Sequence, residues 1–233
     1  MIRWLLIVVL LALQGCATVA NPNPRDPLES FNRSMFGFND MLDRAVIKPV
    51  ATVYRDTTPN WLRQGVGNFF GNLADVWSIF NNAIQLRGPD TSDSIGRVMV
   101  NSTIGIGGLF DVASDLGIER HTSDFGLTLG RWGVPAGPYI VVPLMGSYTL
   151  REVAAYPLDR QGNLVNHITD DPTWYGVSAL GVVDLRAQYL RAGDVVEGAA
   201  LDKYSFTRDS YFQRQRNRVY DGNPPDEDAQ PEQ

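Results

Sequence analysis

Residues 132–150 are the stretch that most restricts the fold of this 233-residue chain. These 19 residues carry no charge, which is about the length of a helix that crosses a membrane. Three prolines and three glycines interrupt the stretch, and each proline removes a backbone donor and breaks helical hydrogen bonding. We therefore expect an irregular apolar segment, which lies at membrane depth only where it packs against protein or lines a cavity.

Two other segments place apolar residues at helical spacing. The first begins at Asp26-Pro27 and runs to Leu42, and the second covers residues 61–86. The second is rich in asparagine but has few charges, whereas the exposed face of a soluble helix is usually charged. Its composition leaves two readings open, a core helix of a globular domain or a helix that lies along a membrane or a lipid path.

Proline and aspartate mark further helix boundaries. We expect the segment after Leu42 to break at Pro49, and Pro59 to open the next element. Asp171-Pro172 has the pattern of a helix start, with an acidic cap and a proline in the first turn. Residues 202–220 mix aromatic and basic side chains, which predicts a terminal amphipathic helix docked on the body or close to lipid headgroups.

Residues 1–15 resemble a bacterial secretory signal. Arg3 provides a basic start, and the nine apolar residues 5–13 would span only about 13 Å as a helix, too short for a stable membrane span. The segment ends in Leu13-Gln14-Gly15-Cys16, which resembles a lipobox, so Cys16 is the expected lipidation site. Cys16 is also the only cysteine, and one cysteine cannot form an internal disulfide.

Lipidation at Cys16 predicts an anchored protein. A diacylglyceryl group on the thiol and an N-acyl chain anchor a protein firmly, at about 0.8 kcal/mol per buried CH₂. Ala17 follows the cysteine, where an aspartate is typical of inner-membrane retention, so we expect the outer membrane. Residues 16–26 are then the lipidated terminus and a stiff, proline-containing tether.

Net charge and composition limit the partners and the domain organisation that this chain can have. A formal charge of −6 makes nucleic acid an unsuitable partner, because phosphate binding needs a basic surface. Residues 27–220 have the size of one domain, and no internal repeat indicates a solenoid. Residues 221–233 are acidic and proline-rich, which predicts a disordered tail.

The chain lacks the usual signatures of catalysis, so we expect it not to be an enzyme. It has two histidines and no zinc-binding motif, so we expect no metal. His121, Ser123 and Asp124 include the residue types of a catalytic triad, but sequence neighbours rarely have triad geometry. The glycines at 105–108 lack the rest of a dinucleotide or phosphate loop and are interpreted as close packing.

A series of short motifs follows a fixed order along the chain. They are DPLESFNR at 26–33, MFGFN at 35–39, KPVA at 48–51, GNFFGNL at 67–73, NSTIG at 101–105, DFGLTLGRWGV at 124–134, GPY at 137–139 and PLMGS at 143–147. Together they resemble the MlaA (VacJ) family of bacterial lipoproteins over about residues 16–220. Members of that family differ in their last fifty residues, so residues 183–233 carry less weight.

The resemblance implies a mainly α fold and a transport function. The expected body is a single ring-like helical domain in the inner leaflet, with irregular Pro/Gly-rich apolar loops and no single spanning helix. It would be lipid-anchored at the periplasmic face of the outer membrane of a Gram-negative bacterium, beside a trimeric porin. Mislocalised phospholipid would leave the outer leaflet through an amphipathic channel and pass to a soluble periplasmic carrier of the Mla system, maintaining lipid asymmetry.

The same resemblance supplies candidate residues and leaves alternatives. Phospholipid is the transported ligand, and no cofactor is expected beyond the covalent lipid on Cys16. The channel or gating candidates are Asn32, Phe38, Asn39, Phe69, Asn101, Trp132, Tyr139 and Pro143. Two alternative functions remain, a structural lipoprotein that scaffolds a porin or the cell wall, and an envelope lipid hydrolase.

Overall fold

The computed structural model describes residues 23–225 and is mainly α-helical. The predicted lipidation site Cys16 and the signal segment lie outside the described residues. The helical elements are α2 (Glu29–Leu42), the π-helical η1 (Asp43–Ile47), α3 (Lys48–Thr57), α4 (Asn60–Ile84), α5 (Gly88–Thr103), α6 (Val112–Asp115), α7 (Phe125–Arg131), α8 (Leu150–Gly162), the 3₁₀ turn η2 (Leu164–His167), α9 (Asp171–Gln188), α10 (Leu190–Ala199) and α11 (Lys203–Val219). The strands are β1 (Tyr139–Val142) and β2 (Gly146–Thr149).

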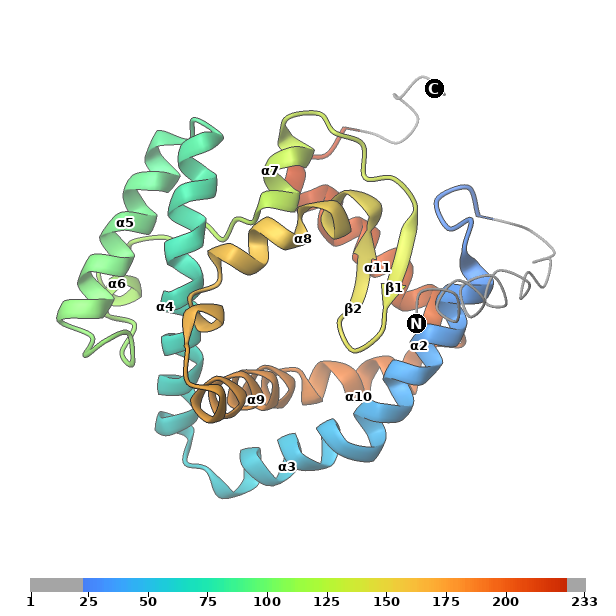
Figure 1. Cartoon of the computed structure of the whole chain (residues 1–233), viewed down its shortest axis with the longest axis horizontal. Helices are drawn as coiled ribbons and strands as arrows, with labels where there is room; N and C mark the ends of the chain where they lie inside the picture. The colour runs from blue at the N-terminus through green and yellow to red at the C-terminus, as the bar shows by residue number, and fades with distance from the viewer. Residues whose placement is uncertain (1–22, 226–233) are drawn as a thin grey trace.

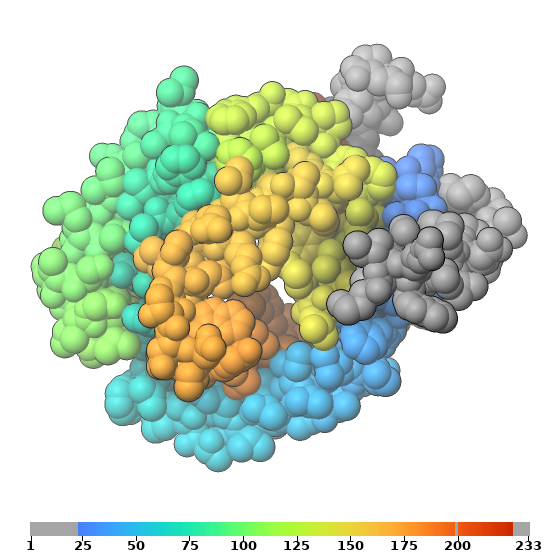
Figure 2. All heavy atoms as spheres, viewed as in Figure 1, coloured from blue at the N-terminus to red at the C-terminus, as the bar shows by residue number. Residues whose placement is uncertain are grey.

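The helices are arranged as a ring. In Figure 1, α2, α3 and α4 form two sides, α7 and α8 form a third, and the β1–β2 hairpin with α11 closes the fourth. Helices α9 and α10 cross the ring on the inside of α3, while α5 and α6 pack outside α4. Side chains do not fill the centre, since Figure 2 shows openings that pass through the body. The fold is therefore the mainly α, ring-like domain that the resemblance implies, and no helix within residues 23–225 has the length and apolarity needed to cross a bilayer.

Several predicted helix boundaries are confirmed, because Pro59 precedes α4 and the Asp202 side chain caps α11. The acidic cap of α9 is Asp170 rather than the predicted Asp171. The predicted start at Asp26-Pro27 is wrong, since α2 begins at Glu29 with Leu28 at its N-cap and no side-chain cap. The expected break at Pro49 is wrong, because the chain remains helical from α2 through η1 into α3. Pro49 lies in the first turn of α3, and the preceding residues form a π-helical turn that accommodates the proline without ending the helix.

The expected irregular loop within residues 132–150 contains a regular hairpin. Strands β1 and β2 pair in antiparallel register, with Tyr139 opposite Thr149 and Val142 opposite Gly146. Leu144 in the connecting turn has φ of 67° and Gly146 has φ of 94°, so the tight turn uses two left-handed residues. The prolines fit this arrangement because they lie outside the two strands, where no ladder donor is lost.

The pattern of burial is inverted relative to a soluble helical protein. The buried residues of α4 are Gly65, Asn72, Asp75, Ser78, Asn81 and Asn82, and those of α5 are Ser94, Arg97 and Asn101. The apolar stripe predicted on α4 is half-buried or exposed, and Trp61 at its start is 69% exposed. Large exposed apolar surfaces on a folded protein mark contact with a membrane or partner. The polar faces of α4 and α5 instead pack against each other, as in the contacts of Asn72 with Ser102 and of Asp75 with Arg97.

A buried arginine joins α4, α5 and α6. Arg97 is 2% exposed and lies 2.7 Å from the carboxylate of Asp111 and 3.5 Å from that of Asp75. Its guanidinium also donates to the Ser114 hydroxyl and to the backbone carbonyl of Ile118. Burial acts to raise the pKa of Asp111, but hydrogen bonds from Ser114, Asn101 and Arg97 lower it to about 2.

The two ends of the described chain meet and close the ring. Asp26 is 1% exposed, so it belongs to the packed body rather than to the end of the tether predicted at 16–26. Its carboxylate accepts hydrogen bonds from Asn32, from the Tyr204 hydroxyl and from Arg208 at 3.2 Å. Tyr204 also belongs to the small apolar core with Tyr139, Val141 and Tyr211. The ring is thus joined between α2, the hairpin and α11.

Part of the tail predicted at 221–233 is attached to the body. The Asp221 carboxylate lies 2.6 Å from Arg87 and 2.5 Å from Arg131. The guanidinium of Arg216 donates to the carbonyl of Pro225. Residues 221–225 therefore have defined partners, and residues 226–233 lie outside the described residues.

Candidate functional site

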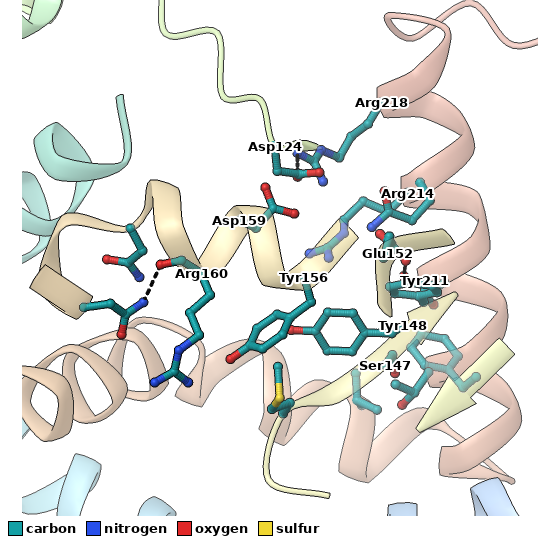
Figure 3. Close-up of a pocket in the computed structure, with 18 residues that line it drawn as sticks. Asp124, Ser147, Tyr148, Glu152, Tyr156, Asp159, Arg160, Tyr211, Arg214 and Arg218 are labelled. Carbon is teal, nitrogen blue, oxygen red and sulfur yellow. Dashed lines mark hydrogen bonds and ion pairs between the residues drawn. The ribbon is translucent and has the colours of Figure 1, made fainter. Parts of the chain in front are cut away.

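A cavity of about 720 Å³ lies at the centre of the ring, and we call it the central cavity. Its walls come from the hairpin, α8, the loop after α8, α10 and α11. Figure 3 shows side chains from these elements that extend into one space. The lining includes Tyr148, Glu152, Tyr156, Asp159, Arg160, Tyr211, Arg214 and Arg218. The volume is in the range of ligand-binding sites, and the lining is polar and aromatic.

The carboxylates of the central cavity are held by donors in its wall. Glu152 accepts hydrogen bonds from the Thr149 backbone N–H at 2.7 Å and hydroxyl at 2.9 Å, and from the Tyr211 hydroxyl. This arrangement includes the capping box at the start of α8. Burial raises the pKa of Glu152, although the hydrogen bonds from Thr149 act in the opposite direction.

Asp159 and Asp124 are held in the same way. Asp159 accepts from the Trp77 indole N–H at 2.8 Å and from the Phe125 backbone N–H at 2.7 Å. Burial raises the pKa of Asp159, against the effect of these two hydrogen bonds. Asp124 caps α7 and is 2.7 Å from the guanidinium of Arg218. All three carboxylates therefore act as acceptors for the scaffold.

Two further cavities adjoin the central one. The first, which we call the apolar cavity, has about 680 Å³ and shares Asp124, Asp159 and Arg218 with it. Its apolar lining consists of Phe70, Leu73, Ala74, Trp77, Val165, Val182 and Leu185. The second, which we call the hairpin cavity, has about 400 Å³ and shares Ser147, Val196 and Thr207 with the central cavity. The shared residues make the three cavities neighbours, so polar and apolar linings adjoin each other inside the ring.

Asn39 is the one predicted candidate that lines any of these three cavities within the described part of the chain. It borders the hairpin cavity, and its side chain binds the turn of the hairpin. The amide of Asn39 donates to the Val142 carbonyl at 3.0 Å, and its oxygen accepts from the Leu144 N–H at 2.8 Å. This placement fits a residue that positions the hairpin beside the cavity.

Three predicted candidates are buried and join structural elements instead. Asn32 is fully buried and binds the Tyr139 carbonyl and the Val141 N–H, each at 2.9 Å. Asn101 is buried, donates to Asp111 and accepts from the Ala113 N–H. Tyr139 is fully buried in the aromatic core. These side chains support the ring and do not border the three cavities. Asn32 and Asn101 bind backbone and carboxylate groups, and the Tyr139 hydroxyl pairs with the Ser147 hydroxyl at 2.7 Å.

The other four candidates lie on the outside or near it. Phe38 and Trp132 are exposed, and Pro143 is exposed in the hairpin turn. Phe69 is half-buried and packs edge-on against Phe70, which is the residue that lines the apolar cavity. The sequence pattern placed two aromatic residues, Phe69 and Phe70, next to each other. It did not show that Phe70, and not Phe69, lines a cavity.

Sequence reasoning missed the charged lining of the central cavity. Arg160, Arg214 and Glu152 occur in segments that carry no recognisable site motif. The one available signal was the mixture of basic and aromatic residues at 202–220, which was assigned to a docked or membrane-surface helix. α11 does dock on the body, but its Tyr211 and Arg214 face the cavity.

The residues considered for catalysis have other partners. His121 contacts Asp90 and Asp93, Ser123 exchanges hydrogen bonds with Ser78 and accepts one from Gln85, and Asp124 pairs with Arg218. Over residues 23–225, no group of three or more histidine, cysteine, aspartate or glutamate side chains is arranged to hold a metal ion. Gly108 has φ of 89° and lies against Asn72, and a Cβ at Gly105 would lie 2.2 Å from the Phe110 carbonyl oxygen. These glycines allow close packing, as expected.

A model of one protein family, described as MlaA lipoprotein, matches residues 24–218. The chain belongs to the MlaA lipoprotein family. It is 34% identical over 208 residues to the "Intermembrane phospholipid transport system lipoprotein MlaA" of Escherichia coli (strain K12), covering 87% of this chain and 82% of the relative. The protein of the same description from Haemophilus influenzae is 32% identical over 231 residues, covering 91% and 88%.

Solved structures contain the same fold. A chain described under "Structural basis for maintenance of bacterial outer membrane lipid asymmetry" matches with a TM-score of 0.73 and 33% identity. The match covers 85% of this chain and 99% of that one, so it includes the whole ring. An uncharacterised Rickettsia typhi protein, RT0044, is 34% identical over 180 residues, covering 77% of this chain and 72% of that protein. The resemblance to MlaA lipoproteins seen in the motifs is thus confirmed over most of the chain.

Proposed function

We propose that this protein transports phospholipid and thereby helps maintain the lipid asymmetry of an outer membrane. The observation that carries the proposal is a polar cavity next to an apolar one, inside a ring with many exposed apolar residues. A phospholipid has a charged headgroup and apolar chains, so it needs both kinds of wall. The related E. coli and H. influenzae proteins are described as intermembrane phospholipid transport lipoproteins, which supports this reading.

The outer surface supports a position within one leaflet of a bilayer. Exposed apolar residues surround the ring, including Val53 on α3, Trp61 on α4, Met99 on α5 and Tyr175 on α9. Each apolar side chain removed from water contributes about 25 cal/mol per Å² of surface. A body with this surface, anchored through a lipid on Cys16, lies in the inner leaflet at the periplasmic face of the outer membrane.

The route of the lipid follows from the same cavities. A mislocalised phospholipid from the outer leaflet enters the central cavity with its headgroup against the polar lining, while its chains occupy the apolar cavity. It leaves toward the periplasm, where a soluble carrier of the Mla system accepts it. A trimeric porin beside the ring gives the body a fixed position in the membrane. No bond of the lipid is broken on this route.

Lipid transfer from membranes to a soluble acceptor tests the proposal. Liposomes that contain the full-length lipidated protein and the porin are mixed with purified carrier, and labelled phospholipid on the carrier is measured over time. Transfer well above that from liposomes with porin alone supports the proposed function. Porin association without any transfer favours a scaffold, and release of fatty acid favours a hydrolase; either result refutes transport.

A further inference from the structure

Two arginines in the central cavity have no partner in the described part of the protein. Arg160 extends from α8 and Arg214 extends from α11, and both line the central cavity. Figure 3 shows both side chains reaching into the same space, with the ring of Tyr156 between them in that view. No hydrogen bond or ion pair joins either guanidinium to another side chain or carbonyl within residues 23–225. The third arginine of the lining, Arg218, is paired with Asp124.

The neighbouring carboxylates do not compensate these two charges. Glu152 and Asp159 accept hydrogen bonds from backbone and side-chain donors of the wall, and Asp124 is bound to Arg218. Burial raises the pKa of both Glu152 and Asp159, which disfavours their charged forms. A guanidinium presents five donors in a planar fork that fits a phosphate or carboxylate oxygen pair. The cavity therefore offers two unused cationic forks.

The groups around Arg160 and Arg214 fit a phosphate ligand better than they fit a ligand with a single isolated charge. Ser210 and Thr207 on α11 and Tyr156 on α8 supply hydroxyl groups in the same lining. Arg214 and Ser210 also line a second polar cavity, which adds Arg87 and Arg131. A phosphate in the central cavity would thus have polar walls around it, and the adjoining apolar cavity would take the chains.

We propose that Arg160 and Arg214 form a binding subsite for the phosphodiester group of a phospholipid in the central cavity. The inference rests on the proposed function and adds to it the chemical group that the cavity recognises. Every glycerophospholipid carries this phosphate, so the subsite selects phospholipid over neutral lipid and not one headgroup over another. Because each arginine makes charge-assisted hydrogen bonds to the phosphate, each side chain raises the affinity for phospholipid about tenfold or more.

The test compares lipids that differ by the phosphate. Full-length protein in detergent is equilibrated with phosphatidylglycerol, phosphatidylethanolamine or diacylglycerol of matched chains, and bound lipid is measured by native mass spectrometry. The variants are R160Q/R214Q, R160K/R214K and R191Q. Arg191 on α10 is the matched control, because it is an exposed arginine that makes no hydrogen bond or ion pair within residues 23–225 and borders none of the cavities described above. Thermal unfolding of each variant reports whether it is folded.

The proposal expects wild type and R191Q to bind both phospholipids at least tenfold more tightly than diacylglycerol. R160Q/R214Q loses this preference, and R160K/R214K keeps part of it because lysine retains charge without the fork. If R160Q/R214Q does not fold, the single variants R160Q and R214Q are each expected to lose about tenfold. An unchanged preference in folded glutamine variants overturns the subsite while lipid binding stands.

Two further results separate this inference from the proposed function. Equal binding of diacylglycerol and phospholipid by wild type refutes phosphate recognition and leaves transport intact. Binding of no lipid at all refutes the proposed function and the subsite together. Free phosphate is tested as a competitor against chloride at equal ionic strength. Displacement of lipid by millimolar inorganic phosphate assigns the two arginines to free phosphate and overturns the headgroup site.

Discussion

Replacement of Asn39 by alanine is expected to loosen the hairpin turn with little effect on the rest of the ring. The substitution removes the hydrogen bonds to the Val142 carbonyl and from the Leu144 N–H, which measure 3.0 and 2.8 Å. Each is worth about 0.5–1.5 kcal/mol, so the turn loses about 1–3 kcal/mol of local stability. Leu144 has φ of 67°, an unfavourable conformation that these contacts help to hold.

Hydrogen exchange at the Leu144 amide measures this loss directly. A loss of about 1–3 kcal/mol raises the rate of exchange through local opening about 5- to 140-fold. Far-UV circular dichroism and thermal unfolding should change little, because Asn32 and the Tyr139 ring still hold the other end of the hairpin. Since Asn39 also borders the hairpin cavity, the lipid-transfer rate is expected to change with the exchange rate.

Asn39→Asp is the matched control, because a carboxylate still accepts from the Leu144 N–H but cannot donate to Val142. It should give an intermediate exchange rate. Deletion of Phe38 and Asn39 together is likewise predicted to alter gating more than stability. Unchanged exchange at Leu144 in Asn39→Ala would refute the role of this side chain, and loss of helical signal in the deletion would show a structural role instead.

Four other changes test separate parts of the structure. Arg97→Leu should destabilise the fold by about 3–5 kcal/mol in thermal or chemical unfolding, because it removes a buried guanidinium that pairs with Asp111 and Asp75 and leaves Asp75 with Arg120 alone. The pKa of Asp111 is about 2 in the fold and 3.8 ordinarily, so its charged form contributes to stability, by about 1 kcal/mol after allowing for its partial exposure. This contribution is complete above pH 3.8 and is lost as pH falls through about 2. Asp111→Asn should therefore reduce the fall in the free energy of unfolding over that pH range. Gly162→Ala places a Cβ 2.0 Å from the indole of Trp77 and should lower stability by about 1–3 kcal/mol, seen also as changed Trp fluorescence. Cys16→Ser should release the protein from washed outer membranes, whereas retention would contradict lipid anchoring through that residue.

Helix positions were predictable from the sequence, whereas the direction each helix faces was not. Proline and aspartate at positions such as Pro59 and Asp170 act locally, so the boundaries of α4 and α9 followed from neighbouring residues. The apolar stripe of α4 defines two faces but not which one is buried. Burial of Asn72 and Asp75 depends on partners from α5 and on Arg120, far along the chain.

The residues of the candidate site were only partly predictable from the sequence. The MlaA-like motifs led us to expect a lipid path, and one of the expected residues, Asn39, borders a cavity. Asn32 and Asn101 were selected because they belong to motifs, but both support the backbone. Arg160 and Arg214 line one cavity only because α8 and α11 pack beside each other, as the hydrogen bond from Tyr211 to Glu152 shows, and no local sequence pattern predicts that packing.

The contact between Asp26 and Arg208, which closes the ring, limits the order in which the chain can fold. Asp26 and Arg208 are separated by 182 positions, so this contact cannot form until nearly the whole chain has been synthesised and exported. A chain truncated before α11 would leave the Asp26 carboxylate buried without its cationic partner, or would leave the ring open. The ring therefore closes only once α11 has been made, and a chain that ends before α11 leaves it open.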